Sequence, residues 1–142
     1  MSQLFLPLHL LSLLYVAWNV IRADHAGFLW MTGKEQLLSK KDISTYHHGT
    51  WIGLGLMIIT GSVLFYPMRE FLLTRPQFYI KMGFVFTLII NGLVIGKISH
   101  IATEKTFISL STREKAPLLI SGAISTISWI GAIVAAFFLI PE

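Results

Sequence analysis

The sequence contains no cysteine and few charged residues. The absence of cysteine excludes a disulfide framework, a Cys-ligated zinc or iron–sulfur site, and thiol chemistry. Charged residues make up 13% of the chain, against about 25% in a typical soluble domain. The H-E-x-x-H zinc motif, nucleophile elbows, phosphate-binding loops and dinucleotide fingerprints are absent as well. These absences point away from a soluble domain and from the enzyme classes that such motifs serve.

Apolar residues are abundant: they occupy 54% of the 142 positions, and the mean hydropathy is +0.70. A membrane-spanning helix needs about 20 mostly apolar residues. Four stretches qualify, approximately residues 4–21, 49–66, 78–98 and 118–140. Because lipid offers no hydrogen bonds to the backbone, these stretches are expected to be helices. The predicted fold is all-α, an integral membrane antiparallel four-helix bundle with residues 1–142 as a single transmembrane domain.

The ends of the spans carry further signals. No cation precedes the first span and no small-residue cleavage pattern follows it, so we expect a retained membrane helix rather than a cleaved signal peptide. Apolar residues continue past Arg22, and Gly33 is the expected stop of that helix. Residues 67–76 predict an interfacial turn bounded by two prolines. Ser111 and Glu114 have the spacing of a capping box.

The distribution of Lys and Arg predicts the orientation of the chain. Most cations lie in the first and third connections, and the two termini have none. By the positive-inside rule, these connections are cytoplasmic and both termini lie outside, in a bacterial-type inner (plasma) membrane. The cations form no clustered runs with interleaved aromatics, so lipid is the expected partner and nucleic acid is not.

Small residues recur at helical spacing in several spans, as expected of membrane helices that pack closely. Gly49 and Gly53 are four residues apart in the second span, as are Gly92 and Gly96 in the third. The fourth span carries a face of small residues, namely Ser121, Ser125, Ser128, Ala132 and Ala135. We interpret these residues as packing faces.

Polar residues inside the spans need a partner or a purpose, because a charge in the bilayer costs at least about 2.5–3.5 kcal/mol. His9 and Lys81 are predicted to lie level with each other, roughly 6–8 Å below the outer surface. Either residue has a plain alternative, since Lys81 can snorkel to the interface and His9 can be a packed, hydrogen-bonded histidine. Asn91 lies mid-span and requires an interhelical hydrogen bond. A second polar group lies at the opposite end and comprises Asp24, His25, His47, His48 and His100.

Helical angles of about 100° per residue predict which side of each helix faces inward. His25 is predicted to point away from His9, and only one of His47 and His48 is expected to face inward. Three faces combine polar and small residues and are predicted to look into the bundle: His9, Ser12, Val16 and Ala23; His48, Gly55, Ser62 and Tyr66; and Lys81, Leu88, Gly92 and Ser99.

These histidines suit a bound cofactor, since membrane four-helix bundles hold haem between helices through axial histidines. A proton path is a second interpretation, because chains of His, Asp and Lys mark proton relays. The spacing of the residues does not choose between the two.

Parts of the chain also resemble a known superfamily. Residues 8–18 (LHLLSLLYVAW) are similar to the histidine-bearing first helix of the copper-resistance D family and of the His-and-Lys-type bacterial membrane protoporphyrinogen oxidase. Residues 59–64 (ITGSVL) and 78–85 (FYIKMGFV) resemble the end of the second helix and the start of the third. Asn91 falls where the copper-resistance proteins often have an asparagine. The likeness covers roughly residues 4–100, and it implies that His9 ligates haem or porphyrin and that Lys81 is essential.

The leading hypothesis is therefore a small inner-membrane redox protein of the haem b type. It would transfer electrons or oxidise a porphyrinogen, with quinone as a possible acceptor and Lys81 as the catalytic residue. His9, Lys81 and Asn91 would bind the cofactor, while the predicted metal ligands are His9, His25, His48 and His100. The alternatives are a copper or metal-ion transport component and a non-catalytic subunit of a membrane complex. A homodimer is compatible with each of these hypotheses.

Overall fold

The structure is a computed structural model that describes residues 2–138, and within that range it contains helices and no strand. The helices are α1 (Ser2–Met31), α2 (Lys40–Leu72), α3 (Pro76–Ile98), the short α4 (Ile101–Glu104) and α5 (Thr112–Phe137). The four long helices are apolar and long enough to cross a membrane. The prediction of an all-α membrane four-helix bundle is confirmed.

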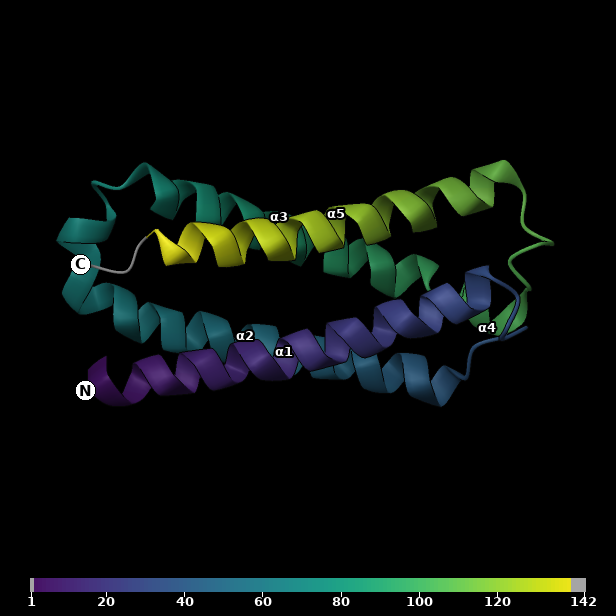
Figure 1. Cartoon of the computed structure of the whole chain (residues 1–142), viewed down its shortest axis with the longest axis horizontal. Coiled ribbons are helices and arrows are strands. Elements are labelled where there is room, and N and C mark those ends of the chain that lie inside the picture. The colour runs from purple at the N-terminus through teal and green to yellow at the C-terminus, as the bar shows by residue number, and fades with distance from the viewer. Residues whose placement is uncertain (1, 139–142) are drawn as a thin grey trace.

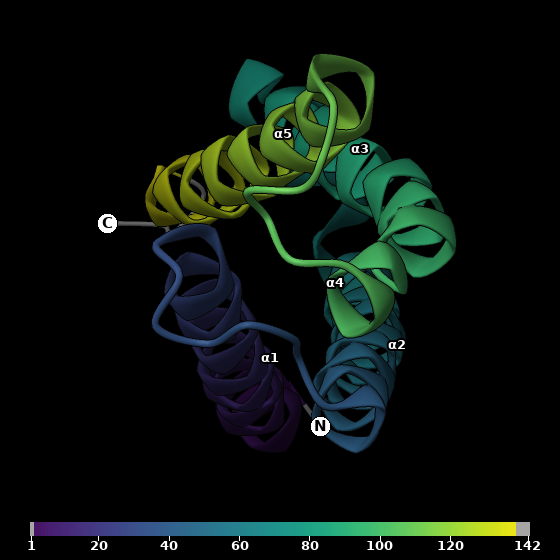
Figure 2. The ribbon, with the colours of Figure 1, turned by 90° about the vertical axis from the view of Figure 1, so that its right-hand side faces the viewer.

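The bundle consists of two antiparallel helix pairs (Figure 1). Helix α1 packs extensively along α2, and α3 packs extensively along α5, whereas α2 and α3 touch only lightly. The start of α1, the α2–α3 connection and the last turns of α5 lie at one end, which we call the terminal end. The connections at residues 32–39 and 99–111 lie at the other end, which we call the loop end. Figure 2 looks onto the loop end and shows the two pairs side by side.

Two helix boundaries test the predictions from sequence. Helix α1 continues to Met31, and Gly33 follows in a left-handed conformation with φ of +79°, so the predicted stop is confirmed. The predicted turn at residues 67–76 is wrong, because α2 runs through Pro67 to Leu72 and leaves residues 73–75 as the connection. A proline removes one backbone hydrogen bond. The helix continues past Pro67 to Leu72 despite that loss.

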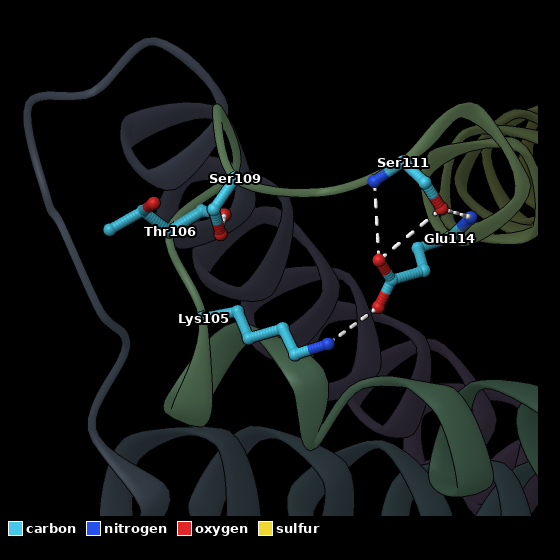
Figure 3. A network of polar contacts seen from close by, with 5 residues as sticks. All are labelled: Lys105, Thr106, Ser109, Ser111 and Glu114. Atoms are coloured by element: carbon cyan, nitrogen blue, oxygen red, sulfur yellow. Dashed lines mark hydrogen bonds and ion pairs between the residues drawn. The ribbon is translucent and has the colours of Figure 1, made fainter.

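Helix α5 begins with the predicted capping box. The Ser111 hydroxyl accepts from the Glu114 N–H, and the Glu114 carboxylate accepts from the Ser111 N–H. Lys105 adds an ion pair to the same carboxylate at 2.9 Å (Figure 3). The helix therefore starts six residues before the predicted start at residue 118. The predicted end of this span, at residues 139–140, lies outside the described residues.

The packing between α1 and α2 depends on two glycines. A Cβ at Gly53 would collide with the side chain of Val16, which is fully buried. A Cβ at Gly49 would collide with the amide of Asn19, which is also buried. Side chains of α1 thus fill the space that the glycines leave on α2, as expected for small residues at a membrane helix interface. The predicted packing role of Gly49 and Gly53 is confirmed.

The glycines of α3 receive side chains from α2 in the same way. A Cβ at Gly92 would lie 3.0 Å from the indole of Trp51, and one at Gly96 would lie 3.1 Å from the ring of His47. Within the α3–α5 pair, the predicted face of small residues on α5 is mostly buried. Its buried members are Ser121, Ser128, Ala132 and Ala135. Both sequence-based packing interpretations are confirmed.

Candidate functional site

A polar site near the terminal end joins α1 to α2 through His9. The half-buried imidazole lies with Nδ1 2.7 Å from the Thr60 hydroxyl, and Thr60 is itself buried. Thr60 donates its only hydroxyl proton to the Leu56 carbonyl at 2.8 Å. With that proton on the Leu56 carbonyl, the hydroxyl oxygen is the acceptor and His9 donates from Nδ1. This arrangement fixes the tautomer of His9 and leaves the lone pair of Nε2 available.

Gly61 lets the imidazole approach the backbone of α2. A Cβ at Gly61 would lie 3.3 Å from Cε1 of His9, which is closer than side chains usually pack. The Thr60–Gly61 dipeptide thus has two separate uses at this site. Thr60 orients the ring, and Gly61 provides the space that the ring needs.

Lys81 is the polar residue that α3 contributes near the terminal end. Its side chain is half-buried in α3, one turn after the helix begins at Pro76. Lys81 and His9 both lie within the first turns of their helices, at the terminal end of the bundle. Within residues 2–138 the ammonium has no ion-pair partner. The structure therefore places His9 and Lys81 near the same end of the bundle, one in each helix pair.

The loop-end histidines lie elsewhere and are largely exposed. His25 and His100 are exposed, and so is His48, whose Nδ1 donates to the Ser44 carbonyl at 2.7 Å. The prediction that the His48 face looks into the bundle is wrong. That face was chosen for its polar and small residues, but Tyr66 on it is 69% exposed. The sides of α2 that pack carry Gly49 and Gly53 against α1, and His47 and Trp51 against α3.

The predicted metal ligands are not brought together. At about 1.5 Å of rise per residue, His9 and His25 lie roughly 24 Å apart along α1. Among the described residues, no group of three or more His, Asp and Glu side chains is placed to hold a metal ion. The histidines at the loop end therefore do not extend the His9 site.

Asn91 is buried and makes the predicted interhelical contact. Its amide donates to the Ser121 carbonyl at 3.0 Å, and its oxygen accepts from the Ser121 hydroxyl at 2.8 Å. These two bonds join α3 to α5 at mid-span. The amide oxygen and one N–H are thereby used in packing, and we assign Asn91 to holding this helix pair together.

The Asn91–Ser121 pair gives a direct prediction about stability. Asn91→Ala and Ser121→Ala are each expected to lower the free energy of unfolding, because each leaves a buried polar group without its partner. The two changes should not be additive, with a coupling of about 0.5–1.7 kcal/mol. Reversible unfolding of the two single variants and the double variant in mixed micelles measures this coupling. Additive losses would contradict the reciprocal pair.

A cavity of about 730 Å³ lies between the two helix pairs in the half nearer the loop end. Its walls are mainly apolar and include Trp30, Trp51, Leu54 and Leu88. His47 lines the cavity, and Trp51 donates its indole N–H to Nε2 of His47 at 3.0 Å. His47 was not among the residues predicted to bind a cofactor or a metal. Trp51 lies one helical turn later on the same face of α2, and this large aromatic residue marks the side of the helix on which His47 packs.

No protein-family model, curated protein or solved structure matches the chain. The helices and their apolar composition define the class: the chain is a multi-pass membrane protein with an all-α four-helix bundle. Two features of its interior bear on function, the His9–Thr60–Lys81 site and the cavity beside His47.

Proposed function

We propose that this chain is a small membrane redox protein of the haem b type, related to the superfamily that it resembles. It would transfer electrons or oxidise a porphyrinogen in a bacterial-type inner membrane. The observation that carries the proposal is the hydrogen bond from His9 Nδ1 to Thr60. Histidines that ligate metals almost always donate their other ring N–H to an acceptor, which fixes the ring and raises its basicity. His9 has this arrangement, with Nε2 as the ligand atom.

The residues present fit a haem in their donor chemistry. An imidazole nitrogen is the common axial ligand of b-type haem, and the Lys81 amine on the facing helix is a second nitrogen donor or a cation for a carboxylate. Gly61 provides room for the ring of His9. The two helix pairs make few contacts with each other, so a planar group between them would displace little packing. When bound, haem supplies one-electron redox chemistry.

Each residue of the site then has its own role. His9 holds the cofactor through Nε2, and Thr60 keeps the imidazole in the productive tautomer. Lys81 completes the site from α3, where its positive charge orients a propionate or a substrate carboxylate. Because its side chain is half-buried, this charge acts in a lower dielectric than water and is correspondingly stronger.

Absorption spectra of the detergent-purified full chain, expressed with ample haem, test the proposal. We expect a Soret band in the oxidised protein and an α-band that appears on reduction. A protein that stays colourless, and that binds no added haem, would contradict the proposal. Retention of other subunits on gentle solubilisation would then support the alternative of a structural subunit.

Thr60→Val is expected to weaken haem binding by about 10–100-fold, the usual cost of losing a residue that orients a metal ligand. The change keeps the shape of the side chain and removes the oxygen that accepts from His9. Thr87→Val is the matched control, because Thr87 is exposed and its hydroxyl bonds only to the Gly83 carbonyl of its own helix turn. Titration of the haem-free proteins with haem measures the difference. Equal affinities for the two variants would remove Thr60 from the site.

A further inference from the structure

The cavity between the helix pairs has the dimensions of a ligand site. Its volume of about 730 Å³ lies within the range of roughly 300–1,000 Å³ that small-molecule pockets occupy. All four long helices contribute to its walls, and His9 and Lys81 do not. It is therefore separate from the site proposed for haem. Its walls are mainly apolar, with Asp24 as the one carboxyl group among them, so they disfavour an anionic ligand and suit a flat, lipid-soluble one.

His47 presents a fixed hydrogen-bond donor on the wall of this cavity. Nε2 accepts from the Trp51 indole, so a neutral His47 carries its proton on Nδ1. No described residue accepts a hydrogen bond from Nδ1. This atom is not fully buried, so a ligand can reach it. The ring is held in place by Trp51 and by the close approach of Gly96. Because His47 lines the cavity, its unpaired N–H is the candidate donor to a ligand that carries an acceptor.

The same hydrogen bond argues against iron at His47. A metal would need the Nε2 lone pair that the indole N–H of Trp51 already occupies. His47 in this conformation is a donor to a ligand, whereas His9 has its Nε2 available as a metal ligand. The two histidines therefore suit different chemistries.

Helices α1 and α5 both line the cavity, and they are not among the extensively packed helix pairs of residues 2–138. Gly27 on α1 and Gly122 on α5 line it, and a Cβ at either position would meet open space. Exposed apolar residues also line it, namely Phe28, Leu119 and Ile127. A ligand can thus enter sideways from the bilayer and leave an apolar tail between the helices.

We propose that this cavity binds a lipid-soluble quinone, with His47 donating a hydrogen bond from Nδ1 to a quinone carbonyl. A quinone head is flat, uncharged and aromatic, carries carbonyl acceptors and has an apolar tail. It therefore matches the walls, the donor and the lateral entry. The inference rests on the proposed redox function for its biological sense, and it deepens that function by assigning a binding place to the quinone that is its possible acceptor. Binding itself requires no haem.

Quenching of tryptophan fluorescence by a short-chain ubiquinone measures binding, since Trp30, Trp51 and Trp129 line the cavity. The wild-type chain is expected to bind saturably. Gly122→Leu places a side chain in the cavity and should weaken binding at least tenfold. Gly83→Leu is the matched control, because Gly83 also faces open space but does not line the cavity. Gly27→Leu fills the cavity from the opposite wall and should repeat the loss, should Gly122→Leu not fold.

Two further variants test the donor. His47→Phe should weaken binding about tenfold, His47→Gln should keep part of it through its amide N–H, and the exposed His48→Phe should change nothing. Saturable binding that is equal in wild type and both cavity-filling variants, or no saturable binding in wild type, would overturn the proposal. Displacement of the quinone by protoporphyrin, with haem lost in His47→Phe but retained in His9→Ala, would also overturn it and make the cavity the porphyrin site.

The same titration on His9→Ala separates this inference from the proposed function. Quinone binding should survive in His9→Ala, where haem binding is expected to fail. A wild-type chain that binds quinone but no haem would leave the cavity site standing and remove the haem proposal.

Discussion

His9→Ala is expected to abolish the haem spectrum of the purified protein. The substitution removes a half-buried imidazole that contacts the neighbouring helix through Nδ1 and keeps Nε2 available. His48 is also anchored through Nδ1, but it is exposed and bonds within its own helix turn. An iron atom without its protein ligand is lost on purification, so the Soret band should fall below detection. Measurement requires equal amounts of folded protein, checked by size-exclusion chromatography in detergent.

His25→Ala is the matched control for this experiment. It makes the same substitution on the same helix, but His25 is exposed near the loop end, and the haem spectrum should be unchanged. His9→Gly with added imidazole provides a second readout, because free imidazole can occupy the vacated space and restore the Soret band. Lys81→Ala should shift the spectrum or lower the affinity. A spectrum that is unaltered in His9→Ala would remove His9 from the haem site.

Gly53→Leu is expected to destabilise the bundle by about 3 kcal/mol or more, or to prevent folding altogether. Even a Cβ at this position would collide with Val16. Val16 is fully buried and β-branched, so its side chain has no second rotamer to adopt without moving a helix. Since α1 packs chiefly against α2, the collision would separate α1 from the rest of the molecule.

Gly55→Leu provides a close control, two residues further along the same helix. A Cβ at Gly55 meets open space, so this variant should unfold within about 0.5 kcal/mol of wild type. Reversible denaturation of both variants in mixed micelles compares their free energies of unfolding. Similar losses for the two variants would show that α1 and α2 do not pack at Gly53 as described.

Hydropathy and small-residue spacing were sufficient to predict most of the fold. The four spans, the helix stop at Gly33, the Ser111–Glu114 capping box and the Asn91 bond all follow from local chemistry that the sequence displays. The continuation of α2 through Pro67 was not predictable from the local rule that proline ends helices. Pro67 costs α2 one backbone hydrogen bond, and the helix continues past it to Leu72.

The site was only partly predictable. The level of His9 and Lys81 along their helices followed from counting residues, but the Thr60 anchor depends on how α1 and α2 are rotated against each other. The prediction that His48 rather than His47 faces inward was wrong, because it too depends on how the helices are rotated against each other. Polarity suggested the His48 face, whereas close approach to Gly92 and Gly96 places Trp51 and His47 against α3. The cavity depends on the separation of two helix pairs, which no single helix encodes.

The division of the bundle into two helix pairs has a consequence for its biogenesis. The His9–Thr60 bond lies within the first pair, and the Asn91–Ser121 bonds lie within the second. Each helical hairpin therefore satisfies these intramembrane polar groups before it meets the other hairpin. The translocation machinery can release α1–α2 into lipid as a finished unit while α3 and α5 are still being synthesised. Co-expressed halves, divided within residues 73–75, should then associate in the membrane. A ligand held between the two halves would stabilise their association.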